Sequence, residues 1–249
     1  MPSPPDTAAS PVVLDRREGP YGEVVLRRRG ERFEIIANGC FLMDTSDGRS
    51  ERLLVDAALE ALDGDGDRGR TSGPDHTPDR NGDGDRTSGP DLLIGGLGVG
   101  FSLARAAAEP RWGRIAVVER EDAVVAWHRT GPLARFSAHA LDDPRVRVLH
   151  QDLVAYVRTS SDTYDALCLD IDNGPDWTVT ENNDSLYTPS GLAACRGRLR
   201  PGGVLAVWSA QPSAAFETAL RDAGFDRVRT IEIQVARGVP DVVHIAVTA

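Results

Sequence analysis

Cysteine and long apolar runs are scarce in this sequence of 249 residues, and its 28 basic residues are outnumbered by 38 acidic ones. Its three cysteines, Cys40, Cys168 and Cys195, are odd in number and widely spaced, which argues against a disulfide framework or a zinc site. We therefore expect free thiols and no bound metal.

No apolar run approaches the roughly 18 residues that a membrane span requires. The first residues, MPSPPDTAAS, lack the basic and then apolar pattern of a signal peptide. Together these absences predict a cytoplasmic protein with no membrane partner. The net charge of -10 argues against a nucleic-acid partner, because such binding depends on clustered basic side chains. We interpret the one basic cluster, RRRG at 27–30, as an exposed strand edge.

Residues 63–90 have almost nothing to bury and contain an imperfect duplication, GDGDRGRTSGPD and then GDGDRTSGPD. Such a segment is predicted to be disordered. The stretch DRNGDGD at 79–85 is similar to a calcium-binding loop, but its twelfth position is Pro90, where a bidentate glutamate is needed. We expect a linker here, without a calcium site.

The part before the linker predicts a small antiparallel β unit, with strands at 23–28, 32–37 and 40–44 and a turn at Asn38 and Gly39. A helix follows in SERLLVDAALEAL, where apolar residues recur at helical spacing and Ser50 is the expected N-cap. The predicted organisation is a disordered N-terminus at 1–20, the β unit with its helix at 21–62, a disordered linker at 63–90, and a catalytic domain at 91–249.

After the linker, strands are predicted at 91–94, 114–119, 146–149, 166–170 and 204–208. They alternate with helices beginning near Phe101, Asp122, Leu153, Leu186 and Ser213, and this alternation indicates a parallel, doubly wound sheet. The last two strands, 228–235 and 242–247, have no helix between them and must pair antiparallel. The predicted class is α/β, a Rossmann-like, mostly parallel seven-stranded sheet of the class I methyltransferase-like arrangement, with the small antiparallel unit in front.

Four glycines fall within GGLGVG at 95–100, between the first of these strands and its helix. Missing side chains let the backbone turn tightly and approach a ligand, while the helix N-terminus supplies free N–H groups. The dinucleotide pattern G-x-G-x-x-G is not met, because its last position is Phe101 counted from Gly96 and Leu103 counted from Gly98. The loop therefore favours a nucleoside ligand other than NAD.

Two acidic residues follow the next strands in the order that nucleoside binding requires. Glu119 ends the second strand, where a carboxylate can accept both ribose hydroxyl protons, and Asp152 follows the third, where it could accept from an adenine amino group. Each acid taken alone favours a solvated charge or a helix cap. Together with the glycine loop, in the order of the fold, the two acids indicate a nucleoside site more strongly.

Five stretches resemble the spermidine synthase-like family: LLIGGLGVG, AVVERED, RVRVLHQDL, YDALCLDIDNGP and LRPGGVLAVW. That family is related to the polyamine aminopropyltransferases, shares the methyltransferase-like fold, and binds S-adenosylmethionine or its decarboxylated form as co-substrate. The resemblance covers most of the chain. It implies a transferase of polyamine biosynthesis and a homodimer that pairs through the N-terminal β unit.

The resemblance also implies a set of site residues. Glu119 would hold the ribose, Asp152 the adenine, and Asp170 would lie beside the reacting sulfur and the acceptor amine. The methionine-derived part of the co-substrate would be wrapped by the loop glycines, Gly95, Gly96, Gly98 and Gly100.

The chain departs from the family pattern around the acceptor. Polyamine-forming members read G-G-G-D-G-G, and the aspartate position is Gly98 here; they read D-x-x-D-P after the fourth strand, where this chain has Asp170 and Asp172 one residue apart. Trp208 stands where glutamine is usual. Several groups that would hold a diamine are gone, so the acceptor site has changed or been lost.

Two hypotheses follow. In the first, the chain transfers an aminopropyl or methyl group from the adenosyl sulfonium to a small acceptor, expected to be an amine, and Asp170 or Asp172 orients the amine and takes its proton. In the second, the chain is a non-catalytic nucleoside-binding protein with a decayed acceptor site, and Asp170 only caps its loop or binds the co-substrate. Retention of both aspartates discriminates between the two, because a pure binder does not require them.

Overall fold

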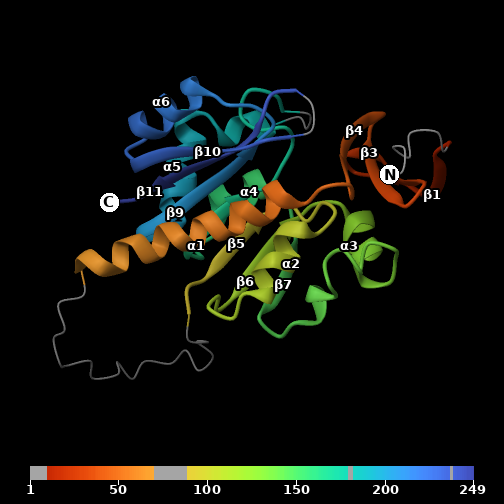
Figure 1. Ribbon diagram of the computed structural model, residues 1–249, viewed down its shortest axis with the longest axis horizontal. Coiled ribbons are helices and arrows are strands. Elements are labelled where there is room, and N and C mark those ends of the chain that lie inside the picture. Colours follow the sequence, from red (N-terminus) through yellow and green to blue (C-terminus); the bar gives the residue numbers. More distant parts are fainter. Residues whose placement is uncertain (1–9, 70–88, 179–181, 236–237) are drawn as a thin grey trace, which may run out of the picture.

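The computed structural model describes residues 10–69, 89–178, 182–235 and 238–249. Figure 1 shows a small sheet set at one end of a larger domain. The small sheet contains β1 (Val12–Gly19), β2 (Gly22–Arg29), β3 (Arg32–Ala37) and β4 (Cys40–Asp44) in the order β1-β2-β3-β4, and every neighbouring pair is antiparallel. Asn38 and Gly39 join the last pair with positive φ angles of 50° and 79°, as a tight Asn-Gly hairpin turn requires.

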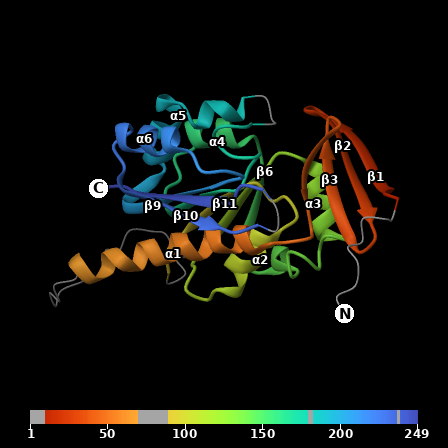
Figure 2. The same cartoon turned by 45° about the horizontal axis from the view of Figure 1, so that its top comes forward.

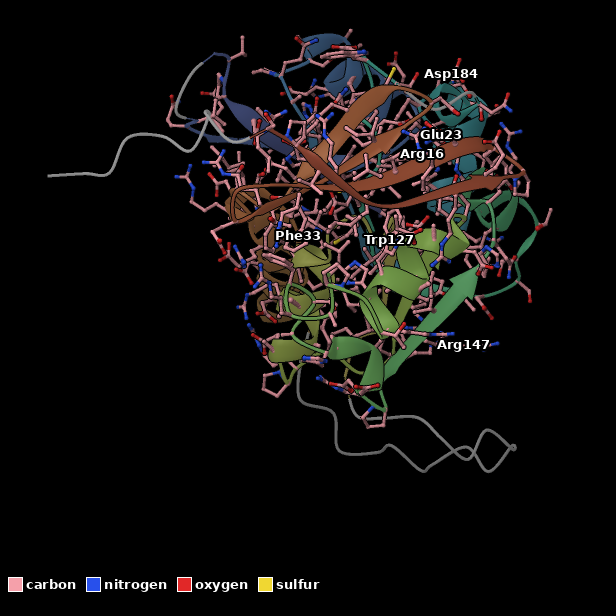
Figure 3. All side chains as sticks on the ribbon, turned by 90° about the vertical axis from the view of Figure 1, so that its right-hand side faces the viewer. Arg16, Glu23, Phe33, Trp127, Arg147 and Asp184 are labelled. Atoms are coloured by element: carbon pink, nitrogen blue, oxygen red, sulfur yellow. The ribbon has the colours of Figure 1, made fainter. Side chains whose placement is uncertain are left out.

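For residues 12–19, the strand β1 corrects the expectation that the N-terminus at 1–20 is disordered, whereas residues 1–9 fall outside the described residues. Its side chains are mostly exposed, so it has no apolar alternation to reveal it; backbone pairing with β2 holds it in place. Asp15 also accepts a hydrogen bond of 2.7 Å from Trp127 Nε1 of the larger domain. Figure 3 shows Trp127 and Phe33 where the two parts meet, and Phe33 packs there edge-on against Phe136.

The larger sheet confirms the predicted class. Its seven strands are ordered β10-β11-β9-β8-β5-β6-β7, parallel from β9 through β7 and antiparallel at β9–β11 and β11–β10. The bounds are β5 (Leu92–Gly95), β6 (Ile115–Glu119), β7 (Val146–His150), β8 (Tyr164–Leu169), β9 (Leu199–Ser209), β10 (Asp226–Ile233) and β11 (Asp241–Val247).

Helices cover both faces of this sheet (Figure 2). One face carries α1 (Arg49–Gly69), α2 (Phe101–Ala108) and α3 (Asp122–Arg129); the other carries α4 (Leu153–Thr159), α5 (Pro189–Gly197) and α6 (Ala214–Asp222). Two short 3₁₀ turns, η1 (Ala140–Asp142) and η2 (Asn183–Leu186), complete the elements. None of the helices within the described ranges has the length and apolar character to cross a membrane.

Two helices begin or end elsewhere than the sequence predicted. Helix α1 begins one residue before Ser50, so that serine lies in the first turn and is not the N-cap. The same helix continues to Gly69, so residues 63–69 of the predicted linker are helical, whereas 70–88 fall outside the described residues, as does the calcium-like stretch at 79–85. Helix α5 begins at Pro189 and not near Leu186, because Thr188 caps it by accepting from Gly191 N.

Arg200 ties together the starts of two central strands. Its guanidinium donates 2.7 Å to Asp91 Oδ2, to the carboxylate of Asp165, and 3.2 Å to the carbonyl of Thr163. Asp165 in turn accepts 2.7 Å from the backbone N–H of Asp91. The three charged side chains are between 17% and 28% exposed, so the network is only partly screened by water.

The substitution Arg200→Met is expected to lower the free energy of unfolding by about 1–3 kcal/mol, because two part-buried carboxylates lose charge-assisted hydrogen bonds. Urea unfolding monitored by circular dichroism measures the change. Arg221→Met is the matched control: Arg221 pairs with Glu217 one helical turn away and is half exposed, so its loss should stay under about 0.5 kcal/mol. Equal losses for both variants would show that the Arg200 network contributes no more than a surface pair.

Candidate functional site

A cavity of about 570 Å³ lies at the carboxyl ends of the parallel strands, between them and the small sheet. Ligands of open α/β sheets bind at this edge. The walls come from β2, β3 and β4, from the first turn of α1, from the loops after β5, β6, β7 and β8, and from the facing ends of β9 and β11. Segments far apart in the sequence therefore meet around one space.

The glycine loop after β5 forms one wall. Gly96 and Gly98 line the cavity with positive φ angles of 93° and 48°. A Cβ on Gly96 would lie 2.5 Å from the backbone oxygen of Asp170, and one on Gly98 would collide with the sulfur of Met43. Position 96 therefore needs glycine both for its positive φ and for the close approach of the Asp170 backbone, and position 98 needs it for its positive φ.

Gly95 and Gly100, the other two predicted binding glycines, are not among the described residues that line the cavity. Gly95 ends β5, where a Cβ would meet the side chain of Leu153, and Gly100 is the N-cap of α2, where a Cβ would meet the ring of His128. Glycine at these two positions is explained by the close packing of Leu153 and His128 against the loop backbone.

His128 supports the loop from behind. It is 2% exposed, and its Nε2 lies 2.9 Å from the carbonyl oxygen of Gly98, so Nε2 carries the proton and donates. Its Nδ1 lies 3.0 Å from Ser137 Oγ. Burial lowers the pKa of His128, which keeps the ring neutral at pH 7.

Glu119 and Asp152 both line the cavity, where the sequence analysis expected the ribose and adenine partners. Glu119 is buried, and its oxygens accept 3.0 Å from Leu97 N and 2.8 Å from Glu121 N; burial nevertheless raises its pKa. Asp152 also caps α4 by accepting 2.8 Å from Ala155 N. Asp152 thus both caps α4 and lines the cavity.

Asp170 and Asp172 follow β8 and face the same space. Ser102 Oγ lies 2.5 Å from Asp170 Oδ2, and burial raises the pKa of Asp170 to about 6. Asp172 has a positive φ of 50° and accepts 2.7 Å from the side-chain amide of Asn183. The structure therefore brings together every predicted acidic site residue.

Glu51 and Asp241 also line the cavity, and the sequence analysis missed both. Burial, and then the charge of Asp170, raises the pKa of Glu51 to about 7. Burial raises the pKa of Asp241. A signal for Glu51 was present, because it falls on the buried stripe of α1 with Leu54, three residues on, and Val55, four residues on.

The cavity is strongly acidic. The chain contains no lysine, and among the described lining residues the only basic side chain is Arg120. Arg120 is itself engaged, 3.2 Å from Glu121 and over the ring of Tyr21. The acidic lining residues are Asp44, Asp47, Glu51, Glu119, Glu121, Asp152, Asp170, Asp172 and Asp241. Such a lining attracts cations and disfavours a ligand with an unpaired carboxylate.

Glu51→Gln is expected to remove a pH-dependent loss of stability. Because the pKa of Glu51 is raised from 4.5 to about 7, the folded state holds a proton in that window that the unfolded state has lost, so stability falls as the pH rises through it. The wild type should lose about 2–3 kcal/mol relative to Glu51→Gln across the window, as measured by urea unfolding at a series of pH values.

Glu60→Gln is the control for this experiment, since Glu60 lies on the solvent side of the same helix. Its stability should change with pH as that of the wild type does. If the Glu51→Gln curve also ran parallel to the wild type, the raised pKa of Glu51 would be refuted.

Comparison with known proteins adds to this geometry. No family model matches the chain. A polyamine aminopropyltransferase 2 of Pseudomonas aeruginosa is 31% identical over 155 residues, which is 58% of this chain and 42% of the relative. A polyamine aminopropyltransferase of Mycobacterium tuberculosis is 26% identical over 207 residues, which is 82% of this chain and 34% of the relative. The matched segments therefore span less than half the length of these curated relatives.

Solved structures match over more of the chain. The spermidine synthase of Thermotoga maritima has a TM-score of 0.69 at 16% identity and covers 95% of this chain and 73% of its own. A spermidine synthase in complex with the transition-state analogue AdoDATO has a TM-score of 0.68 at 16% identity, over 95% and 72%. The chain is thus similar in sequence to polyamine aminopropyltransferases and shares the fold of solved spermidine synthases, in agreement with the resemblance of its motifs.

Proposed function

We propose that the chain binds decarboxylated S-adenosylmethionine and transfers its aminopropyl group to a small amine. The observation that carries this proposal is the acidic cavity, whose only basic lining residue among those described is Arg120. Both the sulfonium of the co-substrate and an incoming ammonium group are cations, and carboxylates are the groups that bind them.

The cavity suits an adenosyl ligand in size and in polar groups. Its volume of about 570 Å³ falls within the range of sites for small ligands, about 300–1,000 Å³. Glu119 would bind the ribose hydroxyls and Asp152 the adenine amino group. The backbone at Gly96 and Gly98 would face the chain that carries the sulfur.

The same charges favour the decarboxylated co-substrate. S-adenosylmethionine carries an α-carboxylate, which in a buried site needs a basic partner. Arg120, the basic residue on the described cavity wall, is already paired with Glu121 and stacked on Tyr21. The decarboxylated form keeps the ammonium and sulfonium groups and lacks that carboxylate, so its charge suits the nine surrounding acids better.

Little chemistry beyond alignment and proton removal is required of the protein. The amine nitrogen forms a bond to the carbon next to sulfur, the carbon–sulfur bond breaks, and its electron pair stays on sulfur, which leaves as a neutral thioether. Asp170 and Asp172 orient the amine, and a carboxylate takes the proton that the ammonium form must lose before attack.

The relatives support this assignment. Those from P. aeruginosa and M. tuberculosis are named polyamine aminopropyltransferases, and the solved spermidine synthases share the fold over nearly the whole chain. Trp208 lines the cavity where the family usually has glutamine, and Gly98 lines it where the family has aspartate. The acceptor is therefore assigned by class, as an amine, and not as one particular diamine.

Calorimetric titration with decarboxylated S-adenosylmethionine, S-adenosylmethionine and methylthioadenosine tests the proposal. The decarboxylated form should bind at least about tenfold more tightly than S-adenosylmethionine, a difference of about 1.4 kcal/mol. Tighter binding of S-adenosylmethionine would contradict aminopropyl transfer and favour methyl transfer. No binding of any of the three would contradict a nucleoside site altogether.

The same titration tests the ribose assignment. Glu119→Ala should weaken methylthioadenosine binding by about 1–3 kcal/mol, because charge-assisted hydrogen bonds to the ribose are lost. Glu31→Ala, an exposed glutamate at the β2–β3 hairpin, is the control and should bind as the wild type does. Unchanged affinity of Glu119→Ala for methylthioadenosine would contradict the assignment of Glu119 to the ribose.

A further inference from the structure

Two carboxyl groups from distant parts of the chain line the same cavity, and the charge of one acts on the other. Glu51 lies in the first turn of α1 and Asp170 follows β8, and both line the cavity. One hydroxyl connects their surroundings: Ser102 Oγ lies 2.5 Å from Asp170 Oδ2 and 3.3 Å from the backbone carbonyl oxygen of Glu51. Ser50 donates a second hydrogen bond, of 2.9 Å, to Glu51 Oε2.

No basic side chain offsets this pair. The two arginines nearest to Glu51 in sequence have other partners. Arg49 binds Asp47 at 2.7 Å, and the guanidinium of Arg52 lies 4.5 Å from the ring centre of Phe101. Within the described residues, no ion pair includes Glu51 or Asp170. The titratable groups on the elements around Glu51 are Asp47 and Arg49 before and on α1, Cys168, Asp170 and Asp172 on and after β8, Asp241 on β11, and Tyr187 before α5.

Two such carboxyls do not both ionise readily, because each charge is poorly solvated and repels the other. At neutral pH the pair therefore keeps a proton, as the raised pKa values of about 7 and about 6 indicate. A bound cation changes this balance, since it stabilises the doubly ionised pair and releases the proton. The pair then has a free carboxylate beside the ligand.

We propose that Glu51 acts with Asp170 as the proton acceptor for the attacking amine, a role that rests on the proposed function. The ammonium form gives one proton to Glu51 and becomes a neutral amine. Its lone pair then forms the nitrogen–carbon bond as the carbon–sulfur bond breaks. The product is a secondary ammonium ion and a neutral thioether, and the proton on Glu51 returns to water.

The other acids of the cavity are less suited to this role. The Asp172 carboxylate accepts from Asn183, and Glu121 is paired with Arg120. Burial raises the pKa of Asp241 as well, but the hydrogen bond from Ser50 and the charge of Arg49 partly offset that rise. Glu51 combines near-complete burial, at 8% exposed, with a pKa near the pH at which a base works best.

Proton release on binding tests the proposal without turnover. Calorimetry of the full chain at pH 7, in buffers of different ionisation enthalpy, gives the number of protons released per ligand. We expect the wild type to release about half to one proton with decarboxylated S-adenosylmethionine and almost none with the neutral methylthioadenosine. In Glu51→Gln the release should fall by at least about half, while Glu60→Gln on the solvent side of α1 should match the wild type.

Equal release by Glu51→Gln and the wild type would overturn the role of Glu51 and leave the proposed function standing. Absence of binding by both nucleosides, or a preference for S-adenosylmethionine, would overturn both. Methylthioadenosine affinity within about twofold of the wild type shows that Glu51→Gln is folded.

The turnover rate with an amine acceptor is a second test of the role of Glu51. We expect kcat to fall about 10²- to 10⁴-fold in Glu51→Gln, and Glu51→Asp, which keeps a carboxylate, to recover at least about tenfold over it. Equal turnover by Glu51→Gln and the wild type, or no recovery in Glu51→Asp with binding intact, would contradict proton transfer to this residue.

Discussion

Carboxyl groups gathered around one cavity repel one another, and they lose hydration when they are buried. In this chain that cost is concentrated at Glu51, Glu119 and Asp170, whose pKa values are all raised by burial. An acid outside the cavity behaves differently: Glu109, held by Arg111, has its pKa lowered to about 2. The chain therefore has arginines that stabilise carboxylates, and of the acids on the cavity wall Asp47 pairs with Arg49 and Glu121 with Arg120. Within the described residues, Glu51 and Asp170 have no such ion pair. A retained proton relieves this repulsion, and so would a cationic ligand.

The fold explains how the acids come together. Parallel strands place Glu119 and Asp170 at one edge of the sheet, because the carboxyl ends of β6 and β8 lie on the same side. Helix α1 crosses the sheet with Leu54 fully buried, which turns Glu51 inward. Antiparallel β11 brings its first residue, Asp241, to the same edge at which β9 ends. The small sheet then covers the opening with apolar residues such as Ile35 and Met43.

Local patterns were enough to predict part of this site. The glycine loop, Glu119 and Asp152 each follow a strand directly, so the strand–loop–helix order places them without knowledge of distant contacts. Glu51 and Asp241 could not be placed in this way, since one precedes the linker and the other begins the last strand, and only the assembled sheet joins them.

Other differences also have physical causes. Strand β1 is held by backbone pairing and by the contact of Asp15 with Trp127. Neither interaction requires alternating apolar residues, so the sequence carries no pattern that predicts this strand. The extension of α1 to Gly69 was missed because glycine and aspartate are weak helix formers, and here they continue a helix that is already packed. The sequence thus predicted the class of the sheet and the acidic residues at the carboxyl ends of β6, β7 and β8, but not the α1 and β11 side of the cavity, where we place proton transfer.

The most direct test of the account is a product assay. The full chain would be incubated with decarboxylated S-adenosylmethionine and a panel of mono-, di- and polyamines, and the products identified by mass spectrometry. The account predicts methylthioadenosine and an aminopropyl adduct of at least one amine in equal amounts. Formation of a methylated product from S-adenosylmethionine, or no product from either co-substrate despite tight binding, would contradict it.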